Sequence, residues 1–299
     1  MLSRHPQIFM CTPKEPWFFA RENPRRRGSR TRSIADTGEK HETLEEYLSL
    51  FAGAAPDQRV GEASTSYLWS KVAAQRIAAM RPDARIIAIF REPAEFLRSL
   101  HLQHLSSHDE SEKSLRKAIA LEAARREGRK IPRHADWPQV LIYTDRLKYV
   151  EQLRRFHSLF APEQILTLIY DDFREDNEAV VRRVLRFLDV DDAHPIKQVK
   201  RNPTVTVRSV RFDGFRRSLR KGRTPALKAL RETGKALTTR RLRERFYWPV
   251  VRDLVFVPPP PVDAEFMLEL RHRFKPEVQA LSDYLDRDLV KLWGYESIG

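Results

Sequence analysis

The fold class of this chain follows from one short segment, Arg85-Ile86-Ile87-Ala88-Ile89-Phe90. After its first residue the segment is an unbroken apolar run, which Pro82-Asp83 precedes and Pro93 follows. The run is too short for a typical helix and rich in β-branched residues, so it predicts a β-strand. Its continuous apolar character is typical of a strand that is buried on both faces of a parallel sheet.

Two further strands and a set of helices are predicted around this segment. Gln164–Tyr170 is a second apolar run, and Arg59–Gly61 is a shorter candidate strand. Apolar residues at helical spacing predict helices over Thr43–Phe51, Ser70–Met80, Pro93–His104, Arg146–Phe160 and Asn177–Leu188. Because helices and strands alternate along the chain, we expect an α/β fold with helices on both faces of a sheet.

The last third of the chain has a different pattern. We expect a loop over Val199–Thr206, a basic helical segment over Arg208–Arg245 and a stiff extended spacer over Val257–Val262. Asp263–Leu285 predicts a final helix or helix pair. With no internal repeat and no second core, residues 1–299 are expected to form a single domain with a helical, basic C-terminal part. A separate basic helical unit over 208–256 is the alternative.

Composition limits the class of protein. Of the 299 residues, 41% are hydrophobic, which excludes a wholly disordered chain. The only cysteine, Cys11, excludes a disulfide framework and fits a reducing compartment. The sequence contains neither an apolar run of membrane-spanning length nor a secretory leader pattern after Met1. We therefore expect a soluble, cytoplasmic protein.

The chain is strongly basic, with 55 Lys and Arg against 41 Asp and Glu and a net charge of +14. Much of this charge lies in Arg25–Arg32, Arg125–Lys130 and Arg208–Arg245. Such runs usually lie on solvated helix faces or loops, and no zinc-finger spacing or RNP-type aromatic motif accompanies them. We expect no nucleic-acid partner, and binding of DNA or RNA through the run Arg208–Arg245 remains an alternative.

Two residues that follow the predicted strand Arg85–Phe90 could hold an anion. Arg91 stands at the carboxyl end of that strand, where ligands bind in open α/β sheets. Ser99 follows about two helical turns later, so a guanidinium and a hydroxyl could share one helix face and hold a phosphate. The alternative is that Arg91 pairs with Glu92 or Glu95 and that Ser99 simply packs within its helix.

Two other segments could contribute to the same site. Glu62 stands at a strand end, before Ser64 and Ser66, where a carboxylate could accept a proton from a hydroxyl nucleophile. The alternative for Glu62 is a carboxylate that caps a helix or fixes a loop. Lys14 lies in a loop with two prolines and could meet an anion, while the following Trp17-Phe18-Phe19 are expected to plug the core.

Metal and serine-hydrolase sites have little support in the sequence. His101 and His104 are three residues apart on one predicted helix, but no acidic residue stands at ligand spacing. We therefore expect surface or half-buried histidines and no metal. The Gly-x-Ser-x-Gly pattern of a nucleophile elbow is absent from the sequence.

Taken in order, these segments resemble the sulfotransferase family, in its bacterial and heparan-type branch. The matching motifs are His5-Pro6-Gln7-Ile8 leading to Lys14–Phe19, Gly61-Glu62-Ala63-Ser64 to Leu68, Arg91-x-Pro93 with Ser99, Tyr149–Leu153 running to Phe160–Gln164, Tyr170–Phe173 before Phe187-Leu188, and Asp288-Leu289 before Trp293. The resemblance covers nearly the whole chain and is looser over residues 205–260.

The resemblance implies a P-loop-NTPase-like parallel sheet flanked by helices and an enzyme that uses 3′-phosphoadenosine 5′-phosphosulfate (PAPS). By it, Arg91 and Ser99 hold the 3′-phosphate of PAPS, Glu62 is the general base on the acceptor hydroxyl, and Lys14 lies near the transferred sulfonate. The acceptor would be a hydroxyl of a small molecule or glycan. No metal is required, because sulfonate transfer needs positioning, charge stabilisation and a base.

One part of the family pattern is not found in this sequence. The family begins with a strand, a loop of the type Lys-x-Gly-Thr-Thr that cradles the 5′-phosphosulfate, and a helix. The segment Met1–Pro6 resembles the end of that helix, so the resemblance implies about 20–25 further residues before Met1. Without them, the chain is expected to be an inactive relative that binds an anionic nucleotide or a partner, and to be poorly soluble.

Overall fold

The computed structural model describes residues 1–20, 43–132, 135, 137–196, 206–207, 256–257 and 261–298. By internal contacts the chain divides into two compact units, one made of Met1–Phe96, Ile142–Arg201 and Glu265–Gly299 and the other of Leu97–Leu141 and Asn202–Ala264. The predicted basic helical segment Arg208–Arg245 and most of the predicted loop Val199–Thr206 lie outside the described residues. The expectation of a single domain remains a prediction.

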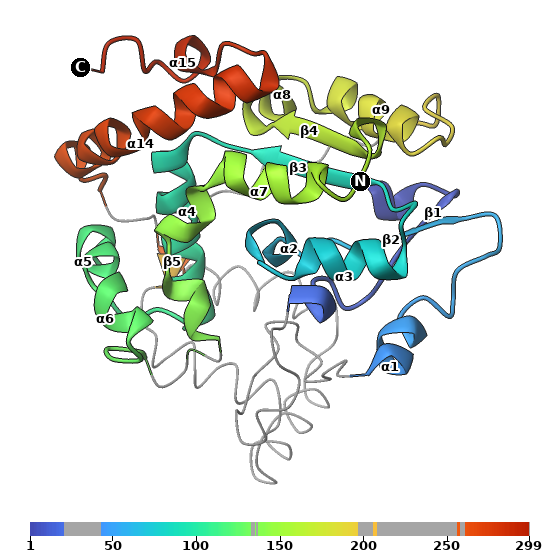
Figure 1. The fold of residues 1–299 in the computed structure, drawn as a ribbon, viewed down its shortest axis with the longest axis horizontal. Coiled ribbons are helices and arrows are strands. Elements are labelled where there is room, and N and C mark those ends of the chain that lie inside the picture. The colour runs from blue at the N-terminus through green and yellow to red at the C-terminus, as the bar shows by residue number, and fades with distance from the viewer. Residues whose placement is uncertain are drawn as a thin grey trace, which may run out of the picture. The chain divides into compact units, whose positions relative to one another are not determined.

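The first unit contains two pairs of parallel strands (Figure 1). β3 (Ile86–Phe90) pairs with β4 (Ile165–Ile169), so that Ala88 lies opposite Thr167. β1 (Ile8–Met10) pairs with β2 (Arg59–Gly61). Parallel neighbours require a crossover connection, and helices provide these connections here. The three strands expected from the sequence are confirmed, whereas the short strand β1 was not predicted.

Helices lie on both faces of the β3–β4 pair, which confirms the α/β class. On one face α7 (Tyr149–His157) brings Phe156 against a cluster that includes Ile86 and Ile165. On the other face α9 (Asn177–Phe187) packs Val184 against Leu166 and Leu168. The burial of these apolar side chains supplies the main stabilisation of such a layer.

The expectation that the central strand is buried on both faces is wrong for the described residues. Ile87 is 37% exposed and Ile89 is 48% exposed. Their partners across the strand pair, Leu166 and Leu168, are buried. The physical reason is that α9 packs against β4, while the described part of the chain places no element over Ile87 and Ile89.

Local signals set the helix boundaries in the rest of the first unit. α1 (Leu44–Ser49) starts at a capping box, in which Thr43 Oγ1 accepts from Glu46 N and the Glu46 carboxylate accepts from Thr43 N. Ser70 separates α2 (Ser66–Trp69) from α3 (Ala73–Met80), because its hydroxyl accepts from Ala73 N. The helix predicted over Ser70–Met80 therefore begins three residues later.

The C-terminal helices are tied to the region that follows β4. α14 (Ala264–Leu285) agrees with the predicted final helix, and α15 (Leu289–Leu292) follows it. Arg287 donates two hydrogen bonds of 2.6 Å to Asp172 in α8 (Tyr170–Glu175). Trp293 Nε1 donates to the neighbouring Asp171 at 2.9 Å. Within the first unit, these bonds fix the C-terminal segment to the region after β4.

The first unit also contains short 3₁₀ segments, which are η1 (Leu2–Arg4), η2 (Phe18–Ala20), η4 (Thr144–Leu147) and η5 (Pro162–Gln164). α4 (Pro93–Ser107) starts in the first unit and continues into the second. The second unit also contains α5 (Leu115–Ala120), α6 (Glu122–Arg126), η3 (Pro138–Leu141) and an antiparallel pair of β5 (Thr206–Val207) with β6 (Phe256–Val257). No helix among the described residues is long and apolar enough to cross a membrane.

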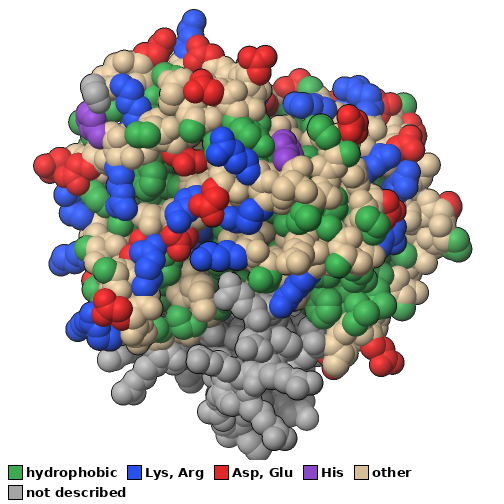
Figure 2. Space-filling view, in the orientation of Figure 1, with side chains coloured by type: hydrophobic (Ala, Val, Ile, Leu, Met, Phe, Trp, Pro, Cys, Tyr) green, Lys and Arg blue, Asp and Glu red, His purple; other side chains and the backbone are tan. Residues whose placement is uncertain are grey.

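Of the three basic runs, Arg125–Lys130 is described by the structure, whereas Arg25–Arg32 and Arg208–Arg245 lie outside the described residues. On the face shown in Figure 2, the basic and acidic side chains of the described residues are interspersed. Within the run Arg125–Lys130, the other basic side chains are exposed, but Arg125 is buried with a 2.8 Å ion pair to the equally buried Glu110. The expectation of a solvated face is wrong for this arginine, because a buried carboxylate neutralises it.

Candidate functional site

Glu62 lies directly after β2 and accepts hydrogen bonds from three hydroxyl groups. Tyr47 donates to Oε1 at 3.1 Å, Tyr67 donates to the same oxygen, and Ser64 donates to Oε2 at 2.6 Å. Burial raises the pKa of Glu62 above its usual value, and the charge of Glu15 adds to this, whereas the three hydroxyl donors act in the opposite direction. A carboxylate with a raised pKa is suited to accept a proton near neutral pH.

The groups around Glu62 stay protonated. Burial, followed by the charge of Glu62, raises the pKa of both Tyr47 and Tyr67 far above the usual value. Burial and the same carboxylate raise the pKa of Cys11 to about 11. The two phenols therefore remain hydrogen-bond donors at physiological pH, and Cys11 remains a neutral thiol and a poor nucleophile.

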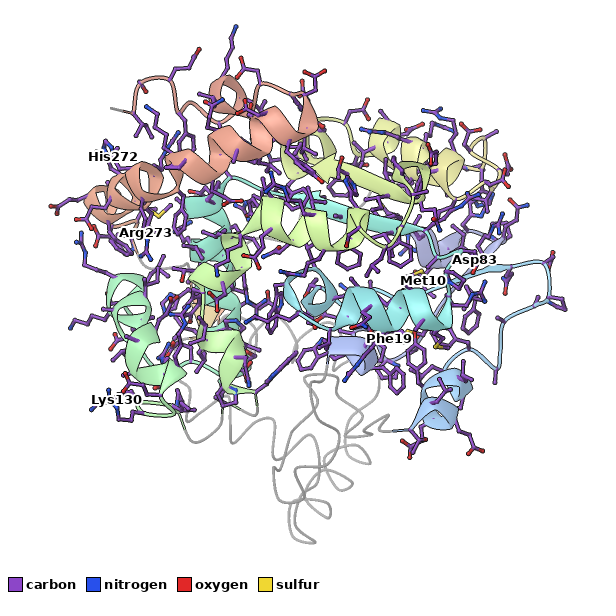
Figure 3. All side chains as sticks on the ribbon, viewed as in Figure 1. Met10, Phe19, Asp83, Lys130, His272 and Arg273 are labelled. Atoms are coloured by element: carbon purple, nitrogen blue, oxygen red, sulfur yellow. The ribbon has the colours of Figure 1, made fainter. Side chains whose placement is uncertain are left out.

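Aromatic rings enclose one side of this cluster. Phe18 stacks on Tyr47 with ring centroids 4.5 Å apart, and Phe19 meets both Tyr47 and Tyr67 edge to face. Phe19 is buried and packs with Ala73 of α3, beside which Figure 3 labels it. The predicted aromatic plug is confirmed for Phe18 and Phe19, and it also explains why the Glu62 carboxylate is desolvated.

The loop that carries Lys14 is attached to the same cluster. Trp17 N donates to Ser64 Oγ at 3.1 Å, and Phe19 N donates to the Tyr67 hydroxyl at 3.4 Å. The Lys14 side chain itself is 73% exposed, and its Nζ lies 3.9 Å from Glu15 Oε1. The structure thus brings the Lys14 loop to Glu62, but the Lys14 ammonium group lies outside the hydrogen-bonded cluster.

Arg91 lies at the carboxyl end of β3, and three contacts define its position. Its Nη2 is 3.2 Å from Glu95 Oε2, and its guanidinium lies 5.0 Å from the ring centre of Tyr170. The Tyr149 hydroxyl donates to the Arg91 carbonyl oxygen at 3.0 Å. The pairing with Glu95, which the sequence offered as the alternative, is present. The Arg91 side chain is nevertheless 26% exposed, and its guanidinium has further N–H donors.

The turn between β3 and α4 is held by a buried carboxylate. Glu92 accepts from Ala94 N at 3.2 Å, from Glu95 N at 2.6 Å and from the Tyr295 hydroxyl. The sequence does not predict the contacts of Tyr295 with Glu92 and of Tyr149 with Arg91, because each pair lies far apart in the chain. Ser99 lies on α4, eight residues after Arg91, in the part of the helix that belongs to the second unit. The joint role of Arg91 and Ser99 remains a prediction.

The expectation for the two histidines of α4 is wrong. His101 is 3% exposed and His104 is 4% exposed, so both are buried. His101 Nε2 is 2.8 Å from the Glu112 carbonyl oxygen, and burial lowers the pKa of His101. Their burial reflects packing within the second unit. Among the described residues, no group of three or more His, Cys, Asp and Glu side chains could hold a metal ion.

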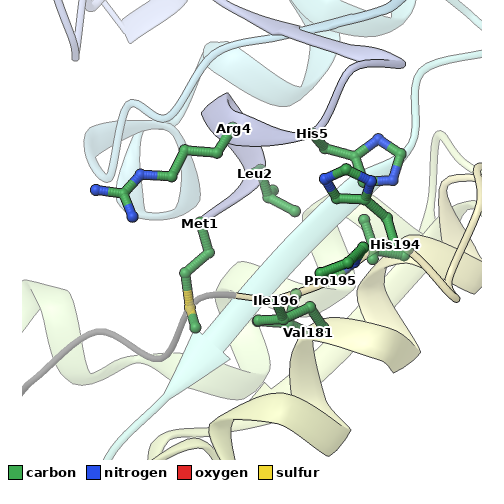
Figure 4. A pocket seen from close by; sticks show the side chains of 9 residues that line it. Met1, Leu2, Arg4, His5, Val181, His194, Pro195 and Ile196 are labelled. Atoms are coloured by element: carbon green, nitrogen blue, oxygen red, sulfur yellow. The ribbon is translucent and has the colours of Figure 1, made fainter.

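A pocket of about 540 Å³ lies elsewhere in the first unit (Figure 4). It is lined by the N-terminal residues Met1, Leu2, Arg4 and His5, by Val181 and Leu185 of α9, and by His194, Pro195 and Ile196. None of Lys14, Glu62, Arg91 and Ser99 contributes to its wall. The residues that the sequence singled out therefore lie outside this pocket, in the hydrogen-bonded cluster of Glu62 after β2 and at Arg91 after β3.

Comparisons with known proteins agree on one family. A family model described as "Sulfotransferase family" matches residues 1–194. The crystal structure of a sulfotransferase from Alicyclobacillus acidocaldarius aligns with a TM-score of 0.62 and 22% identity, covering 96% of this chain and 89% of that chain. A search of curated proteins finds no match. At this identity the structural similarity establishes the fold, which confirms the predicted α/β class.

Proposed function

The chain belongs to the sulfotransferase family, and we propose that it transfers a sulfonate group from PAPS to a hydroxyl group of a small molecule or glycan. The single observation that carries the proposal is the half-buried Glu62 carboxylate. It stands at a strand end, its pKa is raised by burial, and it accepts three hydroxyl hydrogen bonds. A hydroxyl acceptor needs such a base, because its own proton must leave as the new bond to sulfur forms.

The proposed roles follow the resemblance residue by residue. Glu62 takes the proton of the acceptor hydroxyl at one of its carboxylate oxygens. Lys14, whose side chain is exposed, supplies positive charge close to the sulfonate. Arg91 and Ser99 hold the 3′-phosphate, for which the guanidinium offers a fork of donors. PAPS supplies the sulfonate itself, and no metal is needed for these steps.

The fit of Arg91 to a phosphate can be judged from its surroundings. Its present partner Glu95 is 45% exposed at the side chain, so the ion pair is partly solvated and weak. Tyr149 and Tyr170 hold the backbone and the guanidinium plane. A phosphate could therefore replace Glu95 at Arg91 with little loss, and these contacts favour an anion-binding role for this residue.

A further element of the proposal concerns the 5′-phosphosulfate loop. We propose that a strand, this loop and most of the helix after it are encoded before Met1. The exposed aliphatic side chains of Ile87 and Ile89 support this, because helices normally cover both faces of a parallel sheet and such a helix could cover these side chains. Translating the DNA upstream of the Met1 codon in frame tests it. A Lys-x-Gly-Thr-Thr-like loop is expected, and an immediate stop codon would favour an inactive relative.

The binding of the donor product is expected to depend on Arg91 and Ser99. In calorimetric titrations with 3′-phosphoadenosine 5′-phosphate, Arg91→Lys should raise Kd by roughly 10–100-fold and Ser99→Ala by roughly 10-fold, since each removes a hydrogen bond to a charged group. Arg81→Lys is the matched control, because Arg81 is exposed and pairs with Asp83. Binding that is unchanged in all three variants would contradict the assignment.

The same titration tests the proposed function as a whole. Specific binding must raise the melting temperature of the wild-type chain, by an amount that grows with the logarithm of the ligand concentration above Kd. No heat and no stabilisation at concentrations far above the micromolar range, for the upstream-extended chain as well, would refute the use of PAPS.

We also propose a cytoplasmic location. The proposal rests on the single cysteine, which is a buried free thiol, because free thiols are typical of reducing compartments.

A further inference from the structure

Two hydroxyl groups join the Lys14 loop to the Glu62 carboxylate in the same manner. Trp17 N donates to Ser64 Oγ at 3.1 Å, and the Ser64 hydroxyl donates to Glu62 Oε2 at 2.6 Å. Phe19 N donates to the Tyr67 hydroxyl at 3.4 Å, and that hydroxyl donates to Glu62 Oε1. Each hydroxyl accepts from a backbone N–H and donates to the carboxylate, so the direction of each O–H bond is set.

These two hydrogen-bond relays, each running from a backbone N–H through a hydroxyl to Glu62, attach to a loop with an unusual backbone conformation. The Lys14 loop holds Glu15 and Trp17 at φ values of 61° and 58°, a region that few residues other than glycine adopt. Such a conformation persists only where surrounding contacts over-determine it. The hydrogen bonds to Ser64 and Tyr67 are contacts of that kind, and they couple the shape of the loop to the orientation of the carboxylate.

The relays also leave an acceptor position on the Glu62 carboxylate for an incoming hydroxyl. An ionised carboxylate has about four lone-pair positions. Among the described residues, Oε1 accepts from Tyr47 and Tyr67, whereas Oε2 accepts only from Ser64. An incoming hydroxyl would therefore be received on Oε2, and its approach would be governed by the two groups that prevent the carboxylate from rotating.

We propose that Ser64 and Tyr67 are positioning residues, which orient the Glu62 carboxylate against the Lys14 loop so that Oε2 receives the proton of the acceptor hydroxyl. This inference rests on the proposed function for the identity of the proton donor. The orientation of Glu62 by the two hydroxyls is independent of it and can be measured without substrate.

The charged and titratable groups around Glu62 define the direction of the expected effects. They are Cys11 after β1, Glu15 in the Lys14 loop, Tyr47 on α1 and Tyr67 on α2. Burial and Glu15 raise the pKa of Glu62, and the hydroxyl donors lower it by stabilising the charged form. Removing one donor should therefore raise the pKa of Glu62 further.

The test is a carboxyl ¹³C NMR titration of the full chain labelled at glutamate, with the Glu62 resonance assigned from Glu62→Gln. Tyr67→Phe and Ser64→Ala are each expected to raise the Glu62 midpoint by about one pH unit, the equivalent of one hydrogen bond to a charged group. Ser64→Thr keeps the hydroxyl and should restore the wild-type midpoint. Tyr284→Phe is the matched control, because its hydroxyl bonds to His157.

The second readout is the pH profile of kcat/KM with PAPS. The midpoint of its acid limb should shift to higher pH by the same amount in Tyr67→Phe and Ser64→Ala, and should not shift in Ser64→Thr. Unchanged midpoints in both variants would overturn the inference, and so would a general loss of activity at all pH values without a shift of the acid limb. Shifted midpoints, together with no binding of the donor product by the given chain or by the upstream-extended chain, would retain the positioning role and refute the proposed function.

Discussion

The variant Glu62→Gln is expected to lose sulfonate transfer by a factor of about 10²–10⁴ in kcat, the usual contribution of a general base. Glutamine has nearly the same shape as glutamate, and its amide oxygen can still accept from Tyr47 and Tyr67, but its NH2 group only donates at the position that faces Ser64, and it takes up no proton. The effect should lie in kcat, while the affinity for 3′-phosphoadenosine 5′-phosphate should stay unchanged. Steady-state kinetics together with a calorimetric titration of the same preparation measure both quantities.

The matched control for this variant is Glu163→Gln, at an exposed residue in the short 3₁₀ turn before β4. It makes the same chemical change away from the site and should retain full activity. If Glu62→Gln kept more than a tenth of the wild-type kcat, Glu62 would not be the base. The hydrogen bonds that it accepts would then only fix the loop that follows β2.

The same substitution should change how stability depends on pH. Burial raises the pKa of Glu62, so the folded chain holds that proton more tightly than the unfolded chain. The stability contributed by the protonated carboxyl is therefore present at low pH and is lost as the pH rises through the folded-state pKa. Glu62→Gln should remove this loss, so its melting temperature relative to wild type should increase as the pH is raised from about 4 to neutrality. A constant difference would contradict the raised pKa.

The variant Glu110→Ala is expected to lower the free energy of unfolding by about 3–5 kcal/mol, the largest stability effect that we expect from one side chain. Glu110 and Arg125 are both almost fully buried, and their charged atoms lie 2.8 Å apart. Arg125 also donates to the carbonyl oxygens of Ala118 and Leu141, so it cannot move out to water without breaking those bonds. The variant would leave its positive charge buried and unpaired.

Denaturant unfolding of wild type, Glu110→Ala and Glu127→Ala measures this effect. Glu127 pairs with Arg129, and both side chains are more than half exposed, so its removal should cost no more than about 1 kcal/mol. The double variant Glu110→Leu/Arg125→Met should recover most of the loss, because it removes both charges together. Equal effects of Glu110→Ala and Glu127→Ala would show that the second unit does not keep this pair from water.

Local patterns in the sequence are sufficient to predict several elements of the fold. The apolar run Ile86–Phe90 predicts a strand because it is too short for a typical helix, and apolar residues at helical spacing predict α7 and α9. The same runs located Glu62 and Arg91, since polar residues directly after strands lie where α/β sheets bind ligands. The family resemblance likewise rests on the order of these local motifs.

The side chains that surround Glu62 and Glu92 come from distant parts of the chain, and local patterns do not predict them. Tyr47 meets Glu62 across 15 residues, and Tyr295 meets Glu92 across 203 residues. The tertiary structure also decided that Arg125 and His101 are buried and that Ile87 and Ile89 are exposed. A periodic pattern records how a segment divides into polar and apolar faces, whereas burial and pKa depend on the element that packs against each face. That partner comes from elsewhere in the chain, so no local pattern contains it.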